Sequence, residues 1–422
     1  MRRNDSWLSP GSSSPYSRGV HYGNSRSFSA RPLAIILVLV VLLFVLSVIQ
    51  LLRPVPYPAA HATVSDSVIP GAAPSLPWPS QGGGEIEIQN IGPIGGFNVI
   101  SQIPLASVAK IVSALVIVKD HPLAPGNTGP ALTLTAGDVA TYHSMLQQQD
   151  SVMAITAGEQ LNEYQLLEAL LIPSADNISS TLAIWDAGST SAFVAKMNAM
   201  AKSLGMTRTV FKDPTGLNSG TVGTAPDQVL AALALLKNPV LAQIVAMPQA
   251  TFPVVGVDYN VNYDVGHDGF VGVKTGSMGS DGNLVFAATL AGSKDLIVGS
   301  ILGQGGVQPL TAALLASTKL VNAARKVPAQ FTVLKQGQIV ATMSAPGAQP
   351  EPVEASKSVS FLGWPGLRVT FRARFINPGH SVPKGTKVGS LTVAVGGQSA
   401  EVPLITTKSI QSPSLAWRLK RL

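Results

Sequence analysis

Hydrophobic residues follow three different spacings along the chain, and each spacing predicts a different kind of structure. Near the N-terminus, Leu33 to Leu52 is an apolar run of 20 residues that only Ser47 and Gln50 interrupt. At a rise of ~1.5 Å per residue, a helix of this length spans a hydrocarbon core of ~30 Å. The run therefore predicts one N-terminal transmembrane helix.

The charges before this run predict its orientation. Residues 1–31 contain five arginines and one aspartate, which favours a cytoplasmic N-terminus and an extracytoplasmic position for the rest of the chain. A cleaved signal peptide is the alternative, because residues 60–62 (Ala-His-Ala) resemble a cleavage site. Signal peptides have shorter apolar regions of ~7–15 residues. We therefore expect a cytoplasmic basic tail at 1–32 and an uncleaved single-pass anchor in the cell membrane at 33–52.

The second spacing, from 85 to 326, mixes helical and strand periods. The predicted strands are Glu85–Gln89, Phe97–Ser101, Phe270–Lys274, Leu284–Leu290 and Leu296–Ile301. The predicted helices are Ser107–Lys119, Asn162–Leu171, Ala192–Leu204, Asp227–Leu236 and Thr311–Arg325. Asp281-Gly282-Asn283 has the composition of a turn between two of the strands. This order predicts a mainly antiparallel sheet with a helical block inserted between its early and late strands.

The third spacing, from 327 to 407, consists of short alternating segments separated by Gly and Pro turns. The predicted strands are Phe331–Leu334, Ile339–Met343, Ser358–Phe361, Leu367–Phe375 and Leu391–Val395. They predict a second, small all-β domain, so the fold class is α+β and multidomain. Residues 53–84 are rich in Pro, Ser, Ala and Gly and are interpreted as a linker. Residues 408–422 form a basic tail that either lies on a membrane surface or is frayed.

The net charge of +7 is concentrated at the two ends of the chain. Five arginines precede the apolar run, and four basic residues without an acid occupy 408–422, so the body between them is nearly neutral. A nucleic-acid-binding domain needs a basic face, so we expect no nucleic-acid partner. The chain has no cysteine, which excludes disulfides and thiolate chemistry. Its six histidines are scattered, and we expect neither a metal site nor a cofactor.

Two short motifs supply the parts of a serine nucleophile. Ser107-Val-Ala-Lys110 lies at the start of a predicted helix, where the i, i+3 spacing places both side chains on one face. A serine hydroxyl is a weak nucleophile until a base takes its proton. Lysine serves as that base only when burial or a neighbouring cation favours its neutral form. Lys274, in the motif Lys274-Thr275-Gly276, is the candidate cation.

The same Lys-Thr-Gly motif supplies groups that suit a substrate with a carboxylate. Lys274 and Thr275 would hold the carboxylate, and Gly276 would let the substrate backbone approach because it has no Cβ. We expect Lys274 at the end of its strand. The backbone N–H groups of Ser107 and Ser277 would form an oxyanion hole, in which each donor is commonly worth ~2.7–4 kcal/mol.

These motifs, together with Ser174-Ala175-Asp176-Asn177 between them, occur in the order found in a known enzyme family. Further matching segments are Leu105–Lys110, Ala169–Ser174, Phe193 with Met197-Asn198, Leu204–Met206 and Pro214–Leu217. The chain resembles the low-molecular-mass penicillin-binding proteins, which are serine D-alanyl-D-alanine carboxypeptidases with a β-lactamase-like domain. The resemblance implies catalysis at 85–326, and the region at 327–407 is similar to the second domain of that family.

The resemblance also implies the substrate and the site residues. The family cleaves the terminal D-alanine of peptidoglycan stem peptides through an acyl-serine, and β-lactams acylate the same serine. The catalytic residues would be Ser107, Lys110 and Ser174. The substrate-binding residues would be Asp176, Asn177, Lys274, Thr275, Gly276 and Ser277.

The second motif departs from the family. The family commonly has Ser-Gly-Asn-Asp there, and Asp176 and Asn177 have exchanged places. The asparagine of the family binds substrate and contacts the lysine. An ionised Asp176 has only acceptors and would favour the ammonium form of Lys110, which weakens the base. Either Asn177 turns in, or the activity is reduced, or Asp176 acts in another way. Ser277 also replaces a residue that is often larger.

Three functions compete at this point. The first is a D-alanyl-D-alanine carboxypeptidase, and the second is a related enzyme such as an endopeptidase that cuts cross-links. A class A β-lactamase would need a glutamate after the second motif, whereas Glu159 and Glu163 precede Ser174. The third is a membrane-anchored cell-wall-binding protein with an impaired site. The sequence does not separate the first two, because they differ in how a branched substrate enters the cleft.

Overall fold

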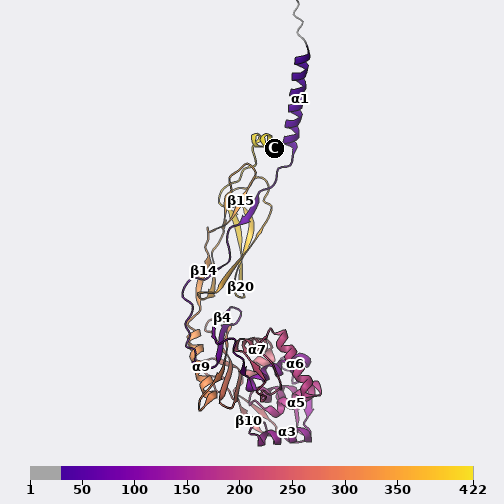
Figure 1. The fold of residues 1–422 in the computed structure, drawn as a ribbon, viewed down its shortest axis with the longest axis vertical. Helices are drawn as coiled ribbons and strands as arrows, with labels where there is room; N and C mark the ends of the chain where they lie inside the picture. The colour runs from indigo at the N-terminus through magenta and orange to yellow at the C-terminus, as the bar shows by residue number, and fades with distance from the viewer. Residues whose placement is uncertain (1–29, 422) are drawn as a thin grey trace, which may run out of the picture.

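The structure is a computed structural model, and it describes residues 30–421. Three parts follow one another along the long axis of the molecule (Figure 1). Helix α1 (Ala30–Leu52) stands at one end, a β-rich region comes next, and a mixed region of helices and strands forms the other end. The side chains of α1 are almost all exposed and apolar, and its length and composition suffice to cross a membrane.

A five-stranded antiparallel sheet forms the centre of the mixed region. Its strands, in spatial order, are β11 (Phe270–Met278), β12 (Asp281–Thr289), β13 (Leu296–Gln304), β3 (Gly83–Ile88) and β4 (Gly92–Phe97). Alternate residues of β12 point to opposite faces, as strand geometry requires. Leu284 and Phe286 pack under α9 (Pro309–Ala324), whereas Val285 and Ala287 join the core of the helical block.

The helical block is inserted between β4 and β11, as the sequence predicts. Its helices are the 3₁₀ helix η1 (Ala106–Ala109), α2 (Lys110–Asp120), α3 (Ala136–Gln147), α4 (Glu163–Leu171), α5 (Asp176–Ala187), α6 (Thr190–Ser203), α7 (Ala225–Lys237) and α8 (Pro239–Val245). Three short antiparallel strand pairs accompany them: β5 (Ile103–Pro104) with β8 (Val222–Gly223), β6 (Ala131–Thr133) with β7 (Gln160–Asn162), and β9 (Gln249–Phe252) with β10 (Gly256–Tyr259). The expected α+β fold is confirmed.

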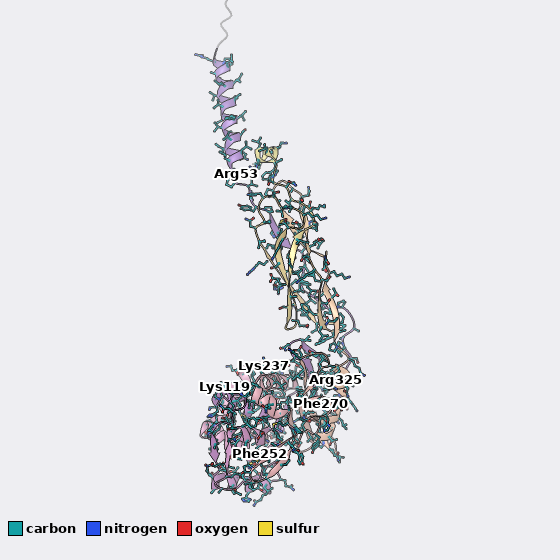
Figure 2. The ribbon with its side chains drawn as sticks, turned by 180° about the vertical axis from the view of Figure 1, so that it is seen from behind. Arg53, Lys119, Lys237, Phe252, Phe270 and Arg325 are labelled. Carbon is teal, nitrogen blue, oxygen red and sulfur yellow. The ribbon has the colours of Figure 1, made fainter. Side chains whose placement is uncertain are left out.

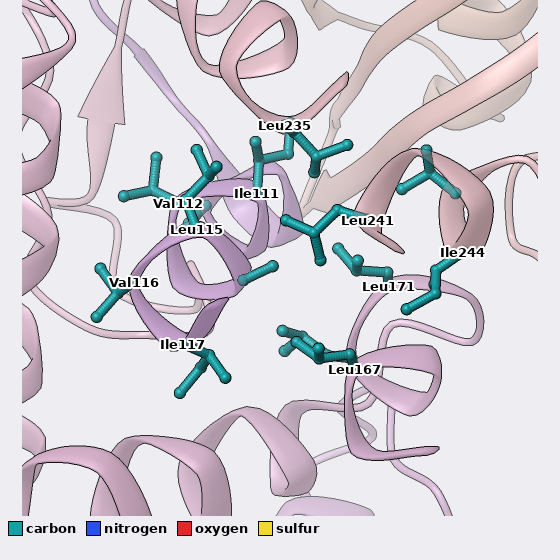
Figure 3. Packing of buried hydrophobic residues seen from close by; sticks show 14 of the residues in the cluster. Ile111, Val112, Leu115, Val116, Ile117, Leu167, Leu171, Leu235, Leu241 and Ile244 are labelled. Atoms are coloured by element: carbon teal, nitrogen blue, oxygen red, sulfur yellow. The ribbon is translucent and has the colours of Figure 1, made fainter. Parts of the chain in front are cut away.

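Helix α2 lies at the centre of this block. Figure 3 shows Ile111 and Leu115 of α2 among side chains from α4, α7 and α8. Burial of one such aliphatic side chain contributes roughly 1.5–3 kcal/mol. Because α2 is buried along most of its length, the segment that begins it is held in a fixed position.

The β-rich region contains a seven-stranded sheet with the order β1, β15, β16, β20, β19, β18, β2. The bounds are β1 (Ala59–Ala62), β2 (Ser67–Val68), β15 (Ile339–Ser344), β16 (Glu351–Ala355), β18 (Arg368–Phe375), β19 (Lys387–Val395) and β20 (Gln398–Thr406). A separate pair joins β14 (Ala329–Leu334) to β17 (Val359–Gly363). Helix α10 (Leu415–Lys420) ends the described chain beside α1 (Figure 1).

The interpretation of residues 53–84 as a linker is wrong for part of this segment. Strand β1 pairs with β15, and β2 pairs with β18, so the segment supplies both edges of the seven-stranded sheet. Asp66 fixes this arrangement because its carboxylate accepts hydrogen bonds from Arg368, Arg372 and the Phe371 N–H. These contacts lower the pKa of Asp66 to about 2.

Two local predictions in the five-stranded sheet are also wrong. Residues 98–101 turn rather than extend, because Asn98 has a φ of +47° and its carbonyl accepts from Ser101 N–H. The turn before β12 lies at Gly279 and Ser280, and Asp281-Gly282-Asn283 begins the strand. Gly282 is needed there for a different reason, since an added Cβ would lie 2.0 Å from the Pro309 carbonyl oxygen.

Candidate active site

The first motif lies where η1 passes into α2. Ser107 is in η1, Lys110 is the first residue of α2, and the Lys110 Nζ donates a hydrogen bond of 2.9 Å to the Ser107 Oγ. Ala106, just before the serine, has a φ of +48°, which an alanine rarely adopts. Gly216 presses on this residue so closely that an added Cβ would lie 1.8 Å from the Ala106 oxygen. Strain of this kind is often found at functional sites.

The second motif meets the first at the Lys110 ammonium. The Lys110 Nζ also donates to the Ser174 carbonyl at 2.8 Å, to the Ser174 Oγ at 3.1 Å and to the Asp176 Oδ1 at 2.6 Å. Lys110 is fully buried, and Ser174 and Asp176 are nearly so. Ser174 adopts a φ of +68°, which turns its carbonyl and hydroxyl oxygens toward the same ammonium. Two serine hydroxyls therefore share one buried lysine.

The structure shows where the exchanged residues Asp176 and Asn177 lie. Asp176 occupies the place beside Lys110, at the start of α5. Asn177 uses its amide elsewhere: its Oδ1 accepts from the Met153 N–H and its Nδ2 donates to the Met153 carbonyl, both at 3.0 Å. Asn177 thus fastens the segment before β7 to α5. Of the alternatives that the sequence leaves open, the one in which Asn177 turns in toward Lys110 is therefore not the arrangement in this structure.

The third motif lies on β11, the edge strand of the sheet. Lys274 is in the middle of this strand and not at its end, because the strand continues to Met278 and pairs with β12 throughout. The Lys274 Nζ donates to the Thr275 carbonyl at 3.1 Å. Burial lowers the pKa of Lys274 well below its usual value; Lys110 lowers it further, and Asp176 acts in the opposite direction.

The three motifs line one small pocket. Its walls include Ser107, Ser174, Thr275, Gly276 and Ser277. Gly276 is required by the protein itself, because an added Cβ would lie 2.8 Å from the Leu105 carbonyl and 3.0 Å from the Ser107 nitrogen. The absence of a side chain therefore lets β11 approach the serine as well as a substrate.

Asn283 and Ser151 are among the positions at the site that the sequence does not single out. Asn283 of β12 donates to the Pro104 and Leu105 carbonyls, and its Oδ1 accepts from the Gly303 N–H. Asn283 thereby holds the segment before Ser107 against the sheet. In the sequence, only its position as a polar residue at the start of an apolar strand could have indicated this role. Ser151 lines the pocket, and its carbonyl accepts from the Asp176 N–H at 2.7 Å.

Chemically, this arrangement places a buried lysine beside a serine hydroxyl, which is where a base would have to lie to take the hydroxyl proton. Among the residues that the structure describes, no histidine lies within hydrogen-bond distance of this lysine. The fold and the site are those expected of a serine hydrolase.

Comparisons with known proteins identify the family. A profile of the D-alanyl-D-alanine carboxypeptidase family matches residues 97–303. D-alanyl-D-alanine carboxypeptidase DacB2 of Mycobacterium tuberculosis is 32% identical over 207 residues, which cover 47% of this chain and 67% of that protein. A D-alanyl-D-alanine endopeptidase of Pseudomonas aeruginosa is 26% identical over 162 residues, covering 38% of this chain and 49% of the relative.

The fold has matches among solved structures. Penicillin binding protein 5 of Haemophilus influenzae aligns with a TM-score of 0.57 at 17% identity, over 81% of this chain and 100% of that structure. This likeness concerns the fold alone. The sequence matches show that the chain belongs to the D-alanyl-D-alanine carboxypeptidase family of serine peptidases.

Proposed function

We propose that this chain removes the terminal D-alanine from peptidoglycan stem peptides through an acyl-enzyme on Ser107, and that β-lactams acylate the same residue. The observation that carries the proposal is the hydrogen bond of 2.9 Å between the Lys110 Nζ and the Ser107 Oγ. Residues 85–326 would form the catalytic domain, and 327–407 a second domain. Membership of the family supports both the reaction and the substrate.

The reaction would proceed in two steps. Lys110 in its neutral form accepts the Ser107 proton while the Oγ attacks the carbonyl carbon of the penultimate D-alanine. The peptide C–N bond then breaks, and the leaving amine takes a proton that Ser174 relays from Lys110. Water hydrolyses the resulting ester and restores Ser107. Electron pairs and protons balance without a cofactor.

The remaining residues of the site would bind the substrate, stabilise the oxyanion and act on Lys110. The Thr275 hydroxyl would hold the terminal carboxylate of the substrate, and the backbone N–H groups of Ser107 and Ser277 would stabilise the oxyanion. The buried Lys274 would act on Lys110 through its charge rather than by touching substrate, because its Nζ is bonded to the Thr275 carbonyl.

We further propose that α1 is an uncleaved anchor with the catalytic region outside the cell. The cleavage-like residues 60–62 belong to β1, so cleavage after Ala62 would remove an edge strand of the seven-stranded sheet. The Arg421 guanidinium donates to the carbonyls of Gln50 and Pro54 at 3.1 Å each, at the end of α1. Helix α10, with Trp417 and its basic residues, would therefore meet the same membrane surface.

The test uses the full-length protein in detergent and its Ser107→Ala variant. Fluorescent penicillin labelling is measured together with D-alanine release from a peptide ending in Lys-D-Ala-D-Ala. We expect both activities in the parent protein and neither in the variant. D-alanine release that survives Ser107→Ala would refute the assignment of the nucleophile.

Two observations each favour an alternative function. The Pseudomonas relative is an endopeptidase, so a cross-linked peptide dimer should be offered as a second substrate. The ion pair between Lys110 and Asp176 favours an impaired enzyme that binds the wall without rapid turnover. Cleavage of the dimer with slow D-alanine release would support the endopeptidase. Penicillin labelling without cleavage of either substrate would support the impaired enzyme.

A further inference from the structure

Two further hollows lie near the serine pocket on the surface of the mixed region of helices and strands. The first, which we call the Gln308 hollow, shares Ser277 and Leu310 with the serine pocket. The second, the Tyr259 hollow, is formed by Pro248 and residues of 259–267. Tyr263 borders both hollows, so the two hollows are neighbours on the surface.

A short wall segment after β10 lies between the serine pocket and the Tyr259 hollow. Val261 of this segment faces the serine pocket, whereas its neighbours Asn260 and Asn262 face the Tyr259 hollow. The Val261 N–H donates to the Ile172 carbonyl, and the Asn260 side chain donates to the Met247 carbonyl, which hold the wall in place. The Tyr259 hollow has a volume of about 440 Å³, within the range of ~300–1,000 Å³ typical of ligand pockets.

The hollows expose aromatic rings and neutral polar groups. Tyr259 and Tyr263 are 66% and 68% exposed, which is unusual for two large rings this close together in the chain. No carboxylate, lysine or arginine lines either hollow in the part of the chain that the structure describes. A groove for a stem peptide, with its charged ends and side chains, would be expected to carry opposite charges. A neutral sugar fits this lining better.

Asn262 provides an independent sign of a ligand. It is 1% exposed, and its Oδ1 accepts from the Asp264 N–H, which fixes the orientation of the amide. Its Nδ2 is buried and has no hydrogen-bond partner among residues 30–421. A buried donor without a partner costs roughly 1–3 kcal/mol. Asn262 lines the Tyr259 hollow, so a carbonyl acceptor that entered beside its amide, such as the acetamido group of an amino sugar, would remove this cost.

We propose that the Gln308 and Tyr259 hollows form a saccharide subsite that binds the N-acetylated amino sugars to which a stem peptide is attached. The tyrosine rings would stack on the apolar faces of the sugar rings, and Asn262 would donate to an acetamido carbonyl. The subsite rests on the proposed function and adds to it a preference for peptides carried on glycan over free peptides. Strand β10 (Figure 1) and Phe252 of β9 (Figure 2) lie at the end of the molecule farthest from α1, where an anchored enzyme would reach the wall.

The test compares two substrates that differ only in the sugar. One is a free peptide ending in D-Ala-D-Ala, and the other is the same peptide attached to a disaccharide of N-acetylated amino sugars. We expect the full-length protein to prefer the second by about tenfold in kcat/KM. The double variant Tyr259→Ser/Tyr263→Ser should bring the ratio close to one. Tyr57→Ser, a change of another exposed tyrosine in the segment before β1, should leave the ratio unchanged.

The outcomes separate this inference from the proposed function. Penicillin labelling of each variant checks that the serine pocket is intact. The saccharide subsite would be overturned if the parent protein had the same kcat/KM for both substrates. It would also be overturned if the double variant lost kcat/KM equally for both substrates. If neither substrate releases D-alanine, the proposed function fails. In that case, NMR titration measures the binding of the free disaccharide to the parent protein and to the double variant. Binding that the double variant loses supports the subsite, and no binding to the parent protein overturns it.

Discussion

Replacement of Asp176 by asparagine tests the departure that most separates this chain from its family. The substitution keeps the shape of the side chain and removes one charge. The Lys110 Nζ lies 2.6 Å from the Asp176 Oδ1, and both groups are buried. At an effective dielectric constant of about 20, two unit charges at this separation attract by roughly 6 kcal/mol before desolvation is counted. Desolvation of the carboxylate offsets a large part of that attraction.

The effect on rate is smaller than this attraction, because the carboxylate acts twice. In the resting enzyme it favours the ammonium form of Lys110, which cannot accept the Ser107 proton. During attack it stabilises the ammonium that forms, but only as far as the proton has moved. The two effects partly cancel, and a remainder of about 1.4 kcal/mol corresponds to a tenfold change in rate. We expect Asp176→Asn to raise the rate of penicillin acylation by about tenfold.

A matched control is available on the same helix. Asp186, near the other end of α5, pairs with Lys196 at 2.7 Å and has a fully buried side chain. Asp186→Asn should leave the acylation rate unchanged. A tenfold fall in acylation by Asp176→Asn would refute the reasoning, since it would show that the carboxylate assists the base. A large loss of thermal stability with an unchanged rate would show that Asp176 is structural.

The remaining predictions concern the nucleophile, the second lysine and two buried acids. Ser107→Ala should abolish penicillin labelling without lowering the melting temperature. Lys274→Met should abolish activity yet raise the free energy of unfolding by about 1–3 kcal/mol, measured by denaturant titration, because burial disfavours the charged lysine. Burial raises the pKa of Glu163 and of Glu168 to about 7. Between pH ~4.5 and ~7 the folded state keeps protons that the unfolded state has lost, so stability should fall as pH rises. Melting curves should show a smaller fall in Glu163→Gln and Glu168→Gln.

Much of the catalytic region could be predicted because its signals are local. The helices carry apolar faces at helical spacing, and capping residues mark their starts, as Asn162 does for α4. The motifs could be ordered and placed on elements for the same reason. The position of Ser107 at a helix start and its spacing from Lys110 follow from helix geometry alone.

The wrong predictions share a different cause. Strand pairing and close contacts of the backbone require few particular side chains, so the sequence does not reveal them. Strands β1 and β2 join the sheet through main-chain hydrogen bonds at its edges, where residues such as Ala59 need no apolar alternation. Gly282 marks close contact with Pro309 and not a turn. The role of Asn283 depends on carbonyls about 180 residues away in sequence, which no local pattern encodes.

The exchange of Asp176 and Asn177 changes the charge of the site more than its geometry. The site buries two lysines, Lys110 and Lys274, close enough for each to disfavour a charge on the other. An asparagine beside Lys110 would leave both without a carboxylate partner. With Asp176 in that place, Lys110 is ion-paired, while burial and the nearby Lys110 together lower the pKa of Lys274. Because Asn177 meanwhile fastens α5 to Met153, the hydroxyls of Ser107 and Ser174 still converge on one ammonium. The resting site is therefore assembled but ion-paired, and its rate should respond to Asp176 more than its fold does.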